Sequence, residues 1–141
     1  MEKTKILLVD DNEVIRIFFK DVFWLHGLED KYDLEIADGF ESAKKTLQDP
    51  QKKPDIVFLD MVMPFNKDGK TITTSEAGLT LLREIKSSPE MKNTKVIIFS
   101  GYTDKASMDQ AKKNGADMYL AKEDHLPQDL IKVLENLNKG K

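Results

Sequence analysis

The chain has 141 residues, of which 40% are hydrophobic, and a formal net charge of −3. This length fits one domain with a core large enough to be stable without cross-links. The lack of cysteine excludes disulfides and thiolate metal sites, and the slightly acidic charge disfavours direct DNA binding. No apolar run approaches the roughly 20 residues that span a bilayer, and residues 1–5 do not begin a signal peptide. We therefore expect a single cytoplasmic domain over residues 1–141, with its core at about 4–138.

Five short apolar runs recur along the chain. They cover residues 6–9, 34–36, 56–59, 96–99 and 118–120. The first, third and fourth runs are continuous and rich in β-branched residues, which is typical of strands buried on both faces. These runs predict five strands.

Apolar residues three or four positions apart predict a helix after each strand. The five stripes are Ile15/Phe18/Val22/Leu25, Ala43/Leu47, Leu79/Leu82/Ile85, Ala106/Ala111 and Leu130/Val133/Leu134/Leu137. Gly27 and Gly115 are placed to end helices, and Pro127 is placed to begin one. The order (βα)5 predicts an α/β fold in which helices cover both faces of a doubly wound parallel sheet.

Residues that can carry chemistry follow four of the predicted strands. Asp10 and Asp11 follow the first strand, Asp60 the third, Ser100 the fourth and Lys122 the fifth. In this fold class, ligands bind beyond the carboxyl ends of the strands. Taken singly, each residue has a simpler explanation as a turn former, a helix cap or a solvated side chain. Their occurrence at four strand ends favours one shared site.

Two adjacent carboxylates at a strand end repel each other. At an effective dielectric near 20, unit charges 4 Å apart repel by about 4 kcal/mol. A hard divalent cation such as Mg²⁺, bound by carboxylate oxygens, offsets this repulsion. The pair Asp10-Asp11 therefore predicts a metal site, although an Asp-Asn helix cap with one solvated neighbour explains the same tetrapeptide.

The combined set suits the formation of an acyl phosphate. A carboxylate can act as a nucleophile, and phosphoryl transfer requires mainly positioning and neutralisation of charge. A metal held by the acids, the amine of Lys122 and the hydroxyl of Ser100 could each neutralise or bind one phosphoryl oxygen. Asp60 is the candidate nucleophile.

With these residues in view, the chain resembles the receiver domain of two-component response regulators over essentially its whole length. The matching pieces are residues 6–11, residues 59–64, Ser100-Gly101-Tyr102, Gly115-Ala116 and residues 119–122. The resemblance implies the flavodoxin-like strand order 2-1-3-4-5. It also implies a phospho-accepting switch rather than an enzyme, which takes its phosphoryl group from a sensor histidine kinase or a histidine phosphotransfer protein.

The same resemblance implies a role for each residue of the site. Asp60 would be the phosphoacceptor and also one of the Mg²⁺ ligands, and Lys122 would be the phosphate-binding lysine. Asp11 would bind Mg²⁺ directly, Asp10 would bind the ion through water or orient it, and the backbone carbonyl of Val62 would complete the protein ligands.

A switch from this site to a protein surface is also implied. Ser100 takes the position of the switch hydroxyl and Tyr119 that of the switch aromatic. The signal would reach the face formed by the fourth helix, the fifth strand and the fifth helix, and change the affinity for a downstream protein.

Three features depart from the receiver pattern. Glu123 follows Lys122 where the family has a proline, so a trans or a strained cis peptide bond is expected. Residues 65–77 form a long polar loop, with Thr73 and Glu76 as a capping box or Ser75 as a rival cap. This loop could cover the site, select the kinase or be a tolerated insertion.

The third departure is the aromatic character of the first helix. Phe19, Phe23 and Trp24 lie off the predicted stripe. They form either a docking surface for phosphodonor helices or part of a wide stripe that faces the core.

Only four residues follow Leu137, so we expect no output domain, no DNA contact and no membrane contact. Three other classes of protein are alternatives to a phospho-accepting receiver. A haloacid dehalogenase would carry Asp rather than Asn12 two residues beyond Asp10. An FMN carrier would not place two acids in its first loop. A receiver that never uses its acceptor, and acts as a constitutive binding module, is the strongest rival.

Overall fold

A computed structural model describes residues 3–139 of the chain, without the side chains of residues 138 and 139. Five parallel strands form the main sheet in the order β2-β1-β3-β6-β7. Their bounds are β1 Thr4–Val9, β2 Tyr32–Ala37, β3 Ile56–Leu59, β6 Lys95–Ser100 and β7 Met118–Ala121. The predicted (βα)5 sheet and its order 2-1-3-4-5 are confirmed. Residues 1–2 and 140–141 lie outside the described residues.

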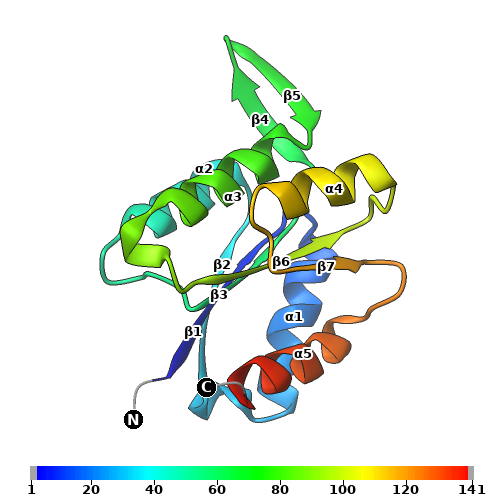
Figure 1. Cartoon of the computed structure of the whole chain (residues 1–141). Helices are drawn as coiled ribbons and strands as arrows, with labels where there is room; N and C mark the ends of the chain where they lie inside the picture. Colours follow the sequence, from blue (N-terminus) through cyan, green and yellow to red (C-terminus); the bar gives the residue numbers. More distant parts are fainter. Residues whose placement is uncertain (1–2, 140–141) are drawn as a thin grey trace.

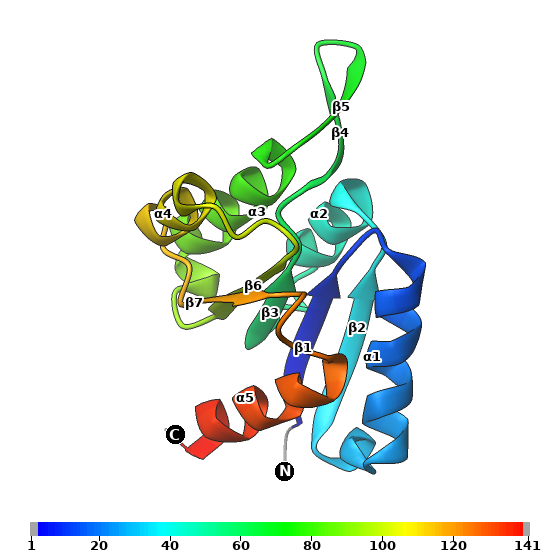
Figure 2. The same cartoon turned by 90° about the vertical axis from the view of Figure 1, so that its right-hand side faces the viewer.

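Five α-helices cover the two faces of this sheet (Figures 1 and 2). They are α1 Glu13–Leu25, α2 Phe40–Gln48, α3 Glu76–Ser87, α4 Lys105–Lys113 and α5 Pro127–Lys139. Short 3₁₀ turns occur at η1 Leu28–Asp30 and η2 Pro89–Met91. Helices α1 and α5 pack on one face, while α2 and α3 pack on the other. Among the described helices, none is long and apolar enough to cross a membrane.

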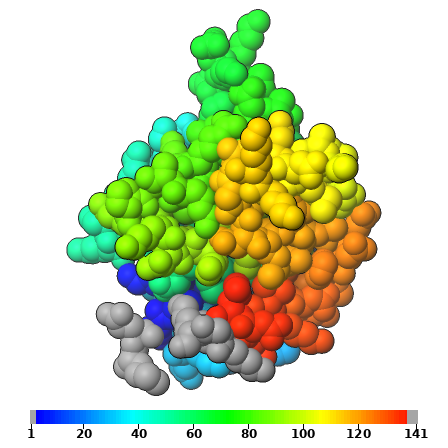
Figure 3. Space-filling model, in the orientation of Figure 1, coloured from blue at the N-terminus to red at the C-terminus, as the bar shows by residue number. Residues whose placement is uncertain are grey.

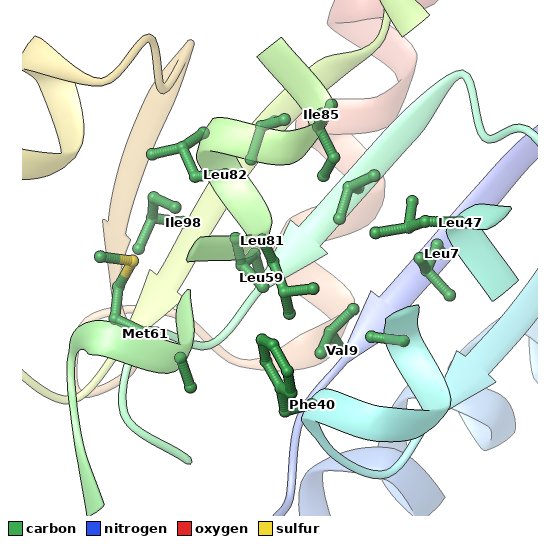
Figure 4. Packing of buried hydrophobic residues seen from close by; sticks show 14 of the residues in the cluster. Leu7, Val9, Phe40, Leu47, Leu59, Met61, Leu81, Leu82, Ile85 and Ile98 are labelled. Atoms are coloured by element: carbon green, nitrogen blue, oxygen red, sulfur yellow. The ribbon is translucent and has the colours of Figure 1, made fainter. Parts of the chain in front are cut away.

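Two apolar cores fix the sheet from its two faces. On one face, Leu7, Val9 and Leu59 pack against side chains of α2 and α3, such as Phe40 and Leu82 (Figure 4). On the other face, residues of α1 and α5 cover the alternate side chains of the same strands. All four residues of β3 are buried, which explains why its sequence is an uninterrupted apolar run.

The ends of the helices follow the expected local signals. The side chain of Asn12 accepts hydrogen bonds from the backbone N–H groups of Val14 and Ile15, so Asn12 caps α1. Gly27 and Gly115 both have positive φ angles just after α1 and α4. Pro127 is the first residue of α5. These four predictions are confirmed.

The predicted stripe of α1 was only partly right: Ile15 packs against the core and Val22 is half-buried, but Phe18 and Leu25 do not face the core. Phe19 and Phe23 are buried, whereas Phe18 and Leu25 are 51% and 70% exposed. The ring of Phe19 stacks on Phe23 at 5.3 Å between centroids and meets Phe58 edge-on at 5.2 Å. These aromatic contacts decide the orientation of a helix whose apolar residues lie on every side. Phe19 and Phe23 therefore face the core, and Trp24 does not.

Two further predictions are corrected. In α4, Ala111 is buried but Ala106 is exposed, because the helix contacts the core only at its end. Helix α3 begins at Glu76 without the predicted Thr73–Glu76 capping box. The hydroxyl of Thr74 accepts the backbone N–H of Glu76 at 3.2 Å, and the rival Ser75 makes no capping bond.

Residues 65–77 are not a loop. They belong mainly to an antiparallel hairpin of β4 Met63–Lys67 and β5 Lys70–Thr74, followed directly by α3. Its two-residue turn, Asp68-Gly69, has φ angles of 53° and 79°. These values fit the left-handed positions of a tight hairpin turn.

Helix α3 begins against the segment that follows β3. The backbone N–H of Gly78 donates to the carbonyl of Met61 at 3.1 Å. A Cβ atom at position 78 would lie 2.5 Å from the Cα of Met61. The glycine therefore allows a close approach of two backbones next to Asp60.

We predict that Gly78→Ala destabilises the protein by about 1–3 kcal/mol, since α3 must move away from Met61. Chemical denaturation of the wild type and the variant measures this loss. Gly101→Ala is the matched control, because a Cβ at position 101 meets no atom within 4 Å. Equal stability of Gly78→Ala and Gly101→Ala would contradict the assignment.

Candidate functional site

The carboxyl ends of the strands meet at one edge of the sheet because the strands are parallel. Val9 of β1 pairs with Leu59 of β3. The backbone N–H of Asp60 donates to the carbonyl of Val9 at 2.9 Å, and that of Lys122 donates to the carbonyl of Ser100 at 2.8 Å. The backbone ladder thus brings the predicted acids, hydroxyl and lysine to the same edge.

Three carboxylates converge there. Asp10 is 1% exposed, Asp60 is also buried, and Asp11 is exposed. One carboxylate oxygen from each residue lies within 4.8 Å of the other two. The backbone N–H of Asn12 donates to Oδ1 of Asp10 at 2.9 Å, which holds that carboxylate in place. Such a group has the charge and the hard oxygen donors that a divalent cation requires.

Lys122 offsets part of this negative charge. Its Nζ lies 2.8 Å from Oδ2 of Asp10 and 3.3 Å from Oδ2 of Asp60. It also lies 5.8 Å from the centroid of the Phe99 ring. The contact with Asp10 is an ion pair without hydrogen-bond geometry, so Oδ2 of Asp10 has no hydrogen-bond partner among the described residues.

The charges of the site shift two pKa values. Burial, and after it the nearby Asp10, raise the pKa of Asp60 to about 7, even though Lys122 opposes the rise. Burial by itself would lower the pKa of Lys122, but the Asp60 and Asp10 carboxylates outweigh burial and raise it. The ionised form of Asp60 is therefore unfavourable in the metal-free protein.

The donor set fits a divalent cation. Three carboxylates and one ammonium leave an excess of two negative charges when all are ionised. The buried Oδ2 of Asp10 lacks a hydrogen bond, and the exposed Asp11 leaves the cluster open to solvent. Val62 is half-buried two residues beyond Asp60. The role of its carbonyl as a metal ligand stays a prediction.

Ser100 and Tyr119 both contact the segment that follows β6. Ser100 is fully buried, and its Oγ accepts the backbone N–H of Tyr102 at 3.0 Å. The hydroxyl of Tyr119 donates to the backbone carbonyl of Tyr102. Burial raises the pKa of Tyr119, while a hydrogen bond with Ser100 opposes the rise. The backbone of Tyr102 thus connects the two predicted switch residues.

Sequence reasoning missed Arg16. Its guanidinium donates to the backbone carbonyl of Asp10 at 3.0 Å and ties the start of α1 to the acid cluster. The available signal was a lone cationic residue in the first turns of a helix that follows two acids.

The departure at Glu123 leaves Lys122 in place, and the peptide bond between them is trans.

We predict that Asp60→Asn stabilises the metal-free protein at about pH 8. The folded carboxyl keeps its proton up to about pH 7, whereas the unfolded carboxyl loses it near pH 4. Between these values the folded state binds more protons, so the stability of the wild type falls as pH rises. One pKa unit is worth about 1.4 kcal/mol, which sets an upper limit of about 4 kcal/mol for the gain.

Thermal unfolding in EDTA at about pH 8 and about pH 4 measures this gain, which should vanish at the lower pH. Lys122 keeps its contact with Asp10 in the variant. Asp109→Asn, on the exposed side of α4, is the control for removing a surface charge. Identical stabilities of wild type and Asp60→Asn at about pH 8 would refute the raised pKa.

Comparisons with known proteins agree with this site. A family model described as the response regulator receiver domain matches residues 6–135. The oxygen regulatory protein NreC of Staphylococcus carnosus is 30% identical over 122 residues, which are 84% of this chain and 48% of NreC. The chain spans about half the length of the curated relatives it matches.

Two crystal structures show the same fold. One is a CheY-like receiver domain protein from Methanospirillum hungatei, with a TM-score of 0.76, 23% identity and coverage of 98% of this chain and 96% of that chain. The other is the receiver domain of a DNA-binding response regulator from Colwellia psychrerythraea, with a TM-score of 0.75, 24% identity and coverage of 97% and 99%. The chain belongs to the response regulator receiver domain family, the signalling switches of two-component systems.

Proposed function

We propose that this chain is a phospho-accepting switch in which Asp60 receives a phosphoryl group from a phosphohistidine. The observation that carries the proposal is the convergence of Asp60 with two further carboxylates and Lys122. Receiver domains interact with histidine kinases, so a sensor kinase or a histidine phosphotransfer protein is the proposed phosphodonor. The proposed downstream partner is a protein that binds the receiver in the cytoplasm.

The proposed reaction forms one bond and breaks one. A carboxylate oxygen of Asp60 attacks phosphorus, and the P–N bond to the donor imidazole breaks. The electron pair of that bond stays on the imidazole nitrogen, which takes a proton from solvent. The product is an acyl phosphate on Asp60. The reaction requires Asp60 in its ionised form, which a bound cation and Lys122 both favour.

Asp10 and Asp11 would hold the ion, and Lys122 would bind a phosphoryl oxygen. Bound Mg²⁺ supplies neutralisation of the acids and of the phosphoryl oxygens. We assign Asp11 as a direct ligand, Asp60 as a further ligand, Asp10 as a helper that binds through water or orients the ion, and the Val62 carbonyl as the remaining protein ligand. Lys122 already contacts Asp60 at 3.3 Å, so a short movement brings its ammonium to a phosphoryl oxygen.

The switch begins at Ser100. Its Oγ now accepts a hydrogen bond from the N–H of Tyr102. A phosphoryl oxygen on Asp60 offers the Ser100 hydroxyl a charged acceptor, and such bonds are stronger than neutral ones. A shift of Ser100 moves the backbone to which Tyr119 is bonded, and thereby changes the face of α4, β7 and α5. The rival module that never uses its acceptor would not require this complete set of acids, hydroxyl and lysine.

Acetyl phosphate with Mg²⁺ should add one phosphoryl group to the wild type, since a small phosphodonor needs no docking surface. Intact-mass spectrometry measures the adduct, which should be sensitive to EDTA and labile to alkali. Asp60→Asn should abolish it, and Asp109→Asn should leave it unchanged. A wild type with no adduct, and with no spectral change on adding beryllofluoride, would overturn the phospho-switch proposal.

Mg²⁺ should stabilise the wild type by mass action. At ten times its dissociation constant, a ligand adds about 1.4 kcal/mol, which raises the melting temperature of a domain this size by roughly 3–6 °C. Asp11→Ala should lose this shift, while Asp109→Ala should keep it. An undiminished shift in Asp11→Ala would exclude Asp11 as a metal ligand.

A further inference from the structure

The β4–β5 hairpin stands clear of the body of the protein, at the edge where the main strands end (Figures 1 and 3). Its base is anchored. Met63 is buried, and the ring of Phe65 meets that of Phe40 edge-on at 4.7 Å between centroids. Lys67 near the tip pairs with Glu76 at the start of α3, at 3.0 Å. The hairpin is therefore held in place by packing at its base and by an ion pair near its tip, and its outer edges face solvent.

The two edges of the hairpin differ in their ability to pair with another strand. Pro64 of β4 lies opposite Thr73 of β5. Proline has no N–H to donate, so this pair occupies a position without ladder hydrogen bonds, and the polar groups of both residues point outward. The β4 edge therefore lacks a donor at Pro64, which blocks pairing.

The β5 edge has no such block. Thr73 points its N–H and carbonyl outward, and Thr71, two residues earlier, does the same by the alternation of an antiparallel ladder. The strand reads Lys-Thr-Ile-Thr-Thr, which combines β-branched side chains with a single charge. Among the described strands, only β4 pairs with β5.

We propose that β5 pairs antiparallel with β5 of a second copy of this chain, so that two hairpins form one four-stranded sheet. The strand is self-complementary about Ile72. Thr71 then lies opposite the partner's Thr73, and Ile72 lies opposite the partner's Ile72. The outward N–H and carbonyl groups of Thr71 then form hydrogen bonds with those of the partner's Thr73. The same bonds form between Thr73 and the partner's Thr71. This inference goes beyond phosphoryl transfer and does not rest on it.

Charge selects the antiparallel arrangement. The tip carries Lys67, Asp68 and Lys70, and Lys67 is paired with Glu76, so in a parallel in-register arrangement Lys70 would lie beside Lys70 of the second copy. The antiparallel arrangement instead sets each tip beside the base of the other hairpin. Lys70 then lies opposite the partner's Thr74, two residues from the partner's Glu76. Glu76, which pairs with Lys67 of its own chain, thus lies near the partner's Lys70.

Sedimentation velocity of the purified chain tests the pairing. The interface is small, so we expect dimers at about 0.1–1 mM rather than at low micromolar concentration. The mass of the wild type should rise from 16.1 kDa toward twice that value. Thr73→Pro removes one outward donor without removing a ladder bond to β4, and should stay at 16.1 kDa.

Asn66→Pro, at an outward position of the β4 edge, is the matched control and should associate like the wild type. A wild type that stays monomeric at every concentration would overturn the proposal, and an extended segment of a different protein would then be the occupant to consider. Association of Thr73→Pro equal to that of the wild type would also overturn it, because another face would be responsible.

A second set of variants, which changes charge and introduces no proline, tests the same pairing if the proline variants fail to fold. Thr71→Lys combined with Thr73→Lys places like charges across the proposed interface, as does Thr71→Glu combined with Thr73→Glu. Both threonines are exposed, so the two double variants should fold. Each should be monomeric alone, and a one-to-one mixture should form the mixed dimer. A mixture that associates no more than either variant alone would contradict the pairing of Thr71 with the partner's Thr73.

Discussion

The structure depends on one electrostatic constraint: three carboxylates share the edge of a buried sheet with a single lysine. The sheet makes this arrangement unavoidable, because the parallel strands are buried on both faces and end at the same edge. Burial raises the energy of the ionised Asp60, and Lys122 compensates only in part. The site is therefore strained without a cation. A cation makes ionised Asp60 more favourable, and that form is the nucleophile in the proposed reaction.

The surroundings of Asp60 connect this constraint to the rest of the molecule. The residue that follows Asp60 contacts the start of α3 through the bond from Gly78 to the carbonyl of Met61. Ser100 binds the backbone of Tyr102, which in turn accepts the hydroxyl of Tyr119. A change of charge at Asp60 therefore lies next to hydrogen bonds that position two other segments. In the proposed switch, these bonds are what the phosphoryl group alters.

The sequence predicted the parts of the structure that depend on local signals. The third strand was placed with the observed bounds, Ile56–Leu59, since a strand buried on both faces must be apolar throughout. Asn12 was recognised as a cap by its residue type. The strand ends could be aligned from topology alone, which is why the acids and Lys122 were expected together. The roles assigned to these residues came from a family resemblance and stay proposals.

The parts that were missed depend on tertiary packing. The phase of α1 could not be read because apolar residues lie on all its sides, and the rings of Phe58 and Tyr32 decide which aromatic residues face inward. Arg16 and Gly78 act on backbone atoms that are brought near only by the fold. The hairpin did carry a local signal. Asp68-Gly69 between Phe65 and Ile72 is typical of a tight turn, but the many polar residues favoured a loop.

The most direct test of this account is the titration of the Asp60 carboxyl by NMR, with a ¹³C label on the aspartate side chains. In the metal-free protein the Asp60 signal should titrate near pH 7, because burial and Asp10 disfavour its charge. Saturating Mg²⁺ should move that titration to lower pH, since the cation favours the ionised form. A titration near pH 4 without metal, unchanged by Mg²⁺, would contradict the claim that this edge of the sheet is electrostatically strained until a cation binds.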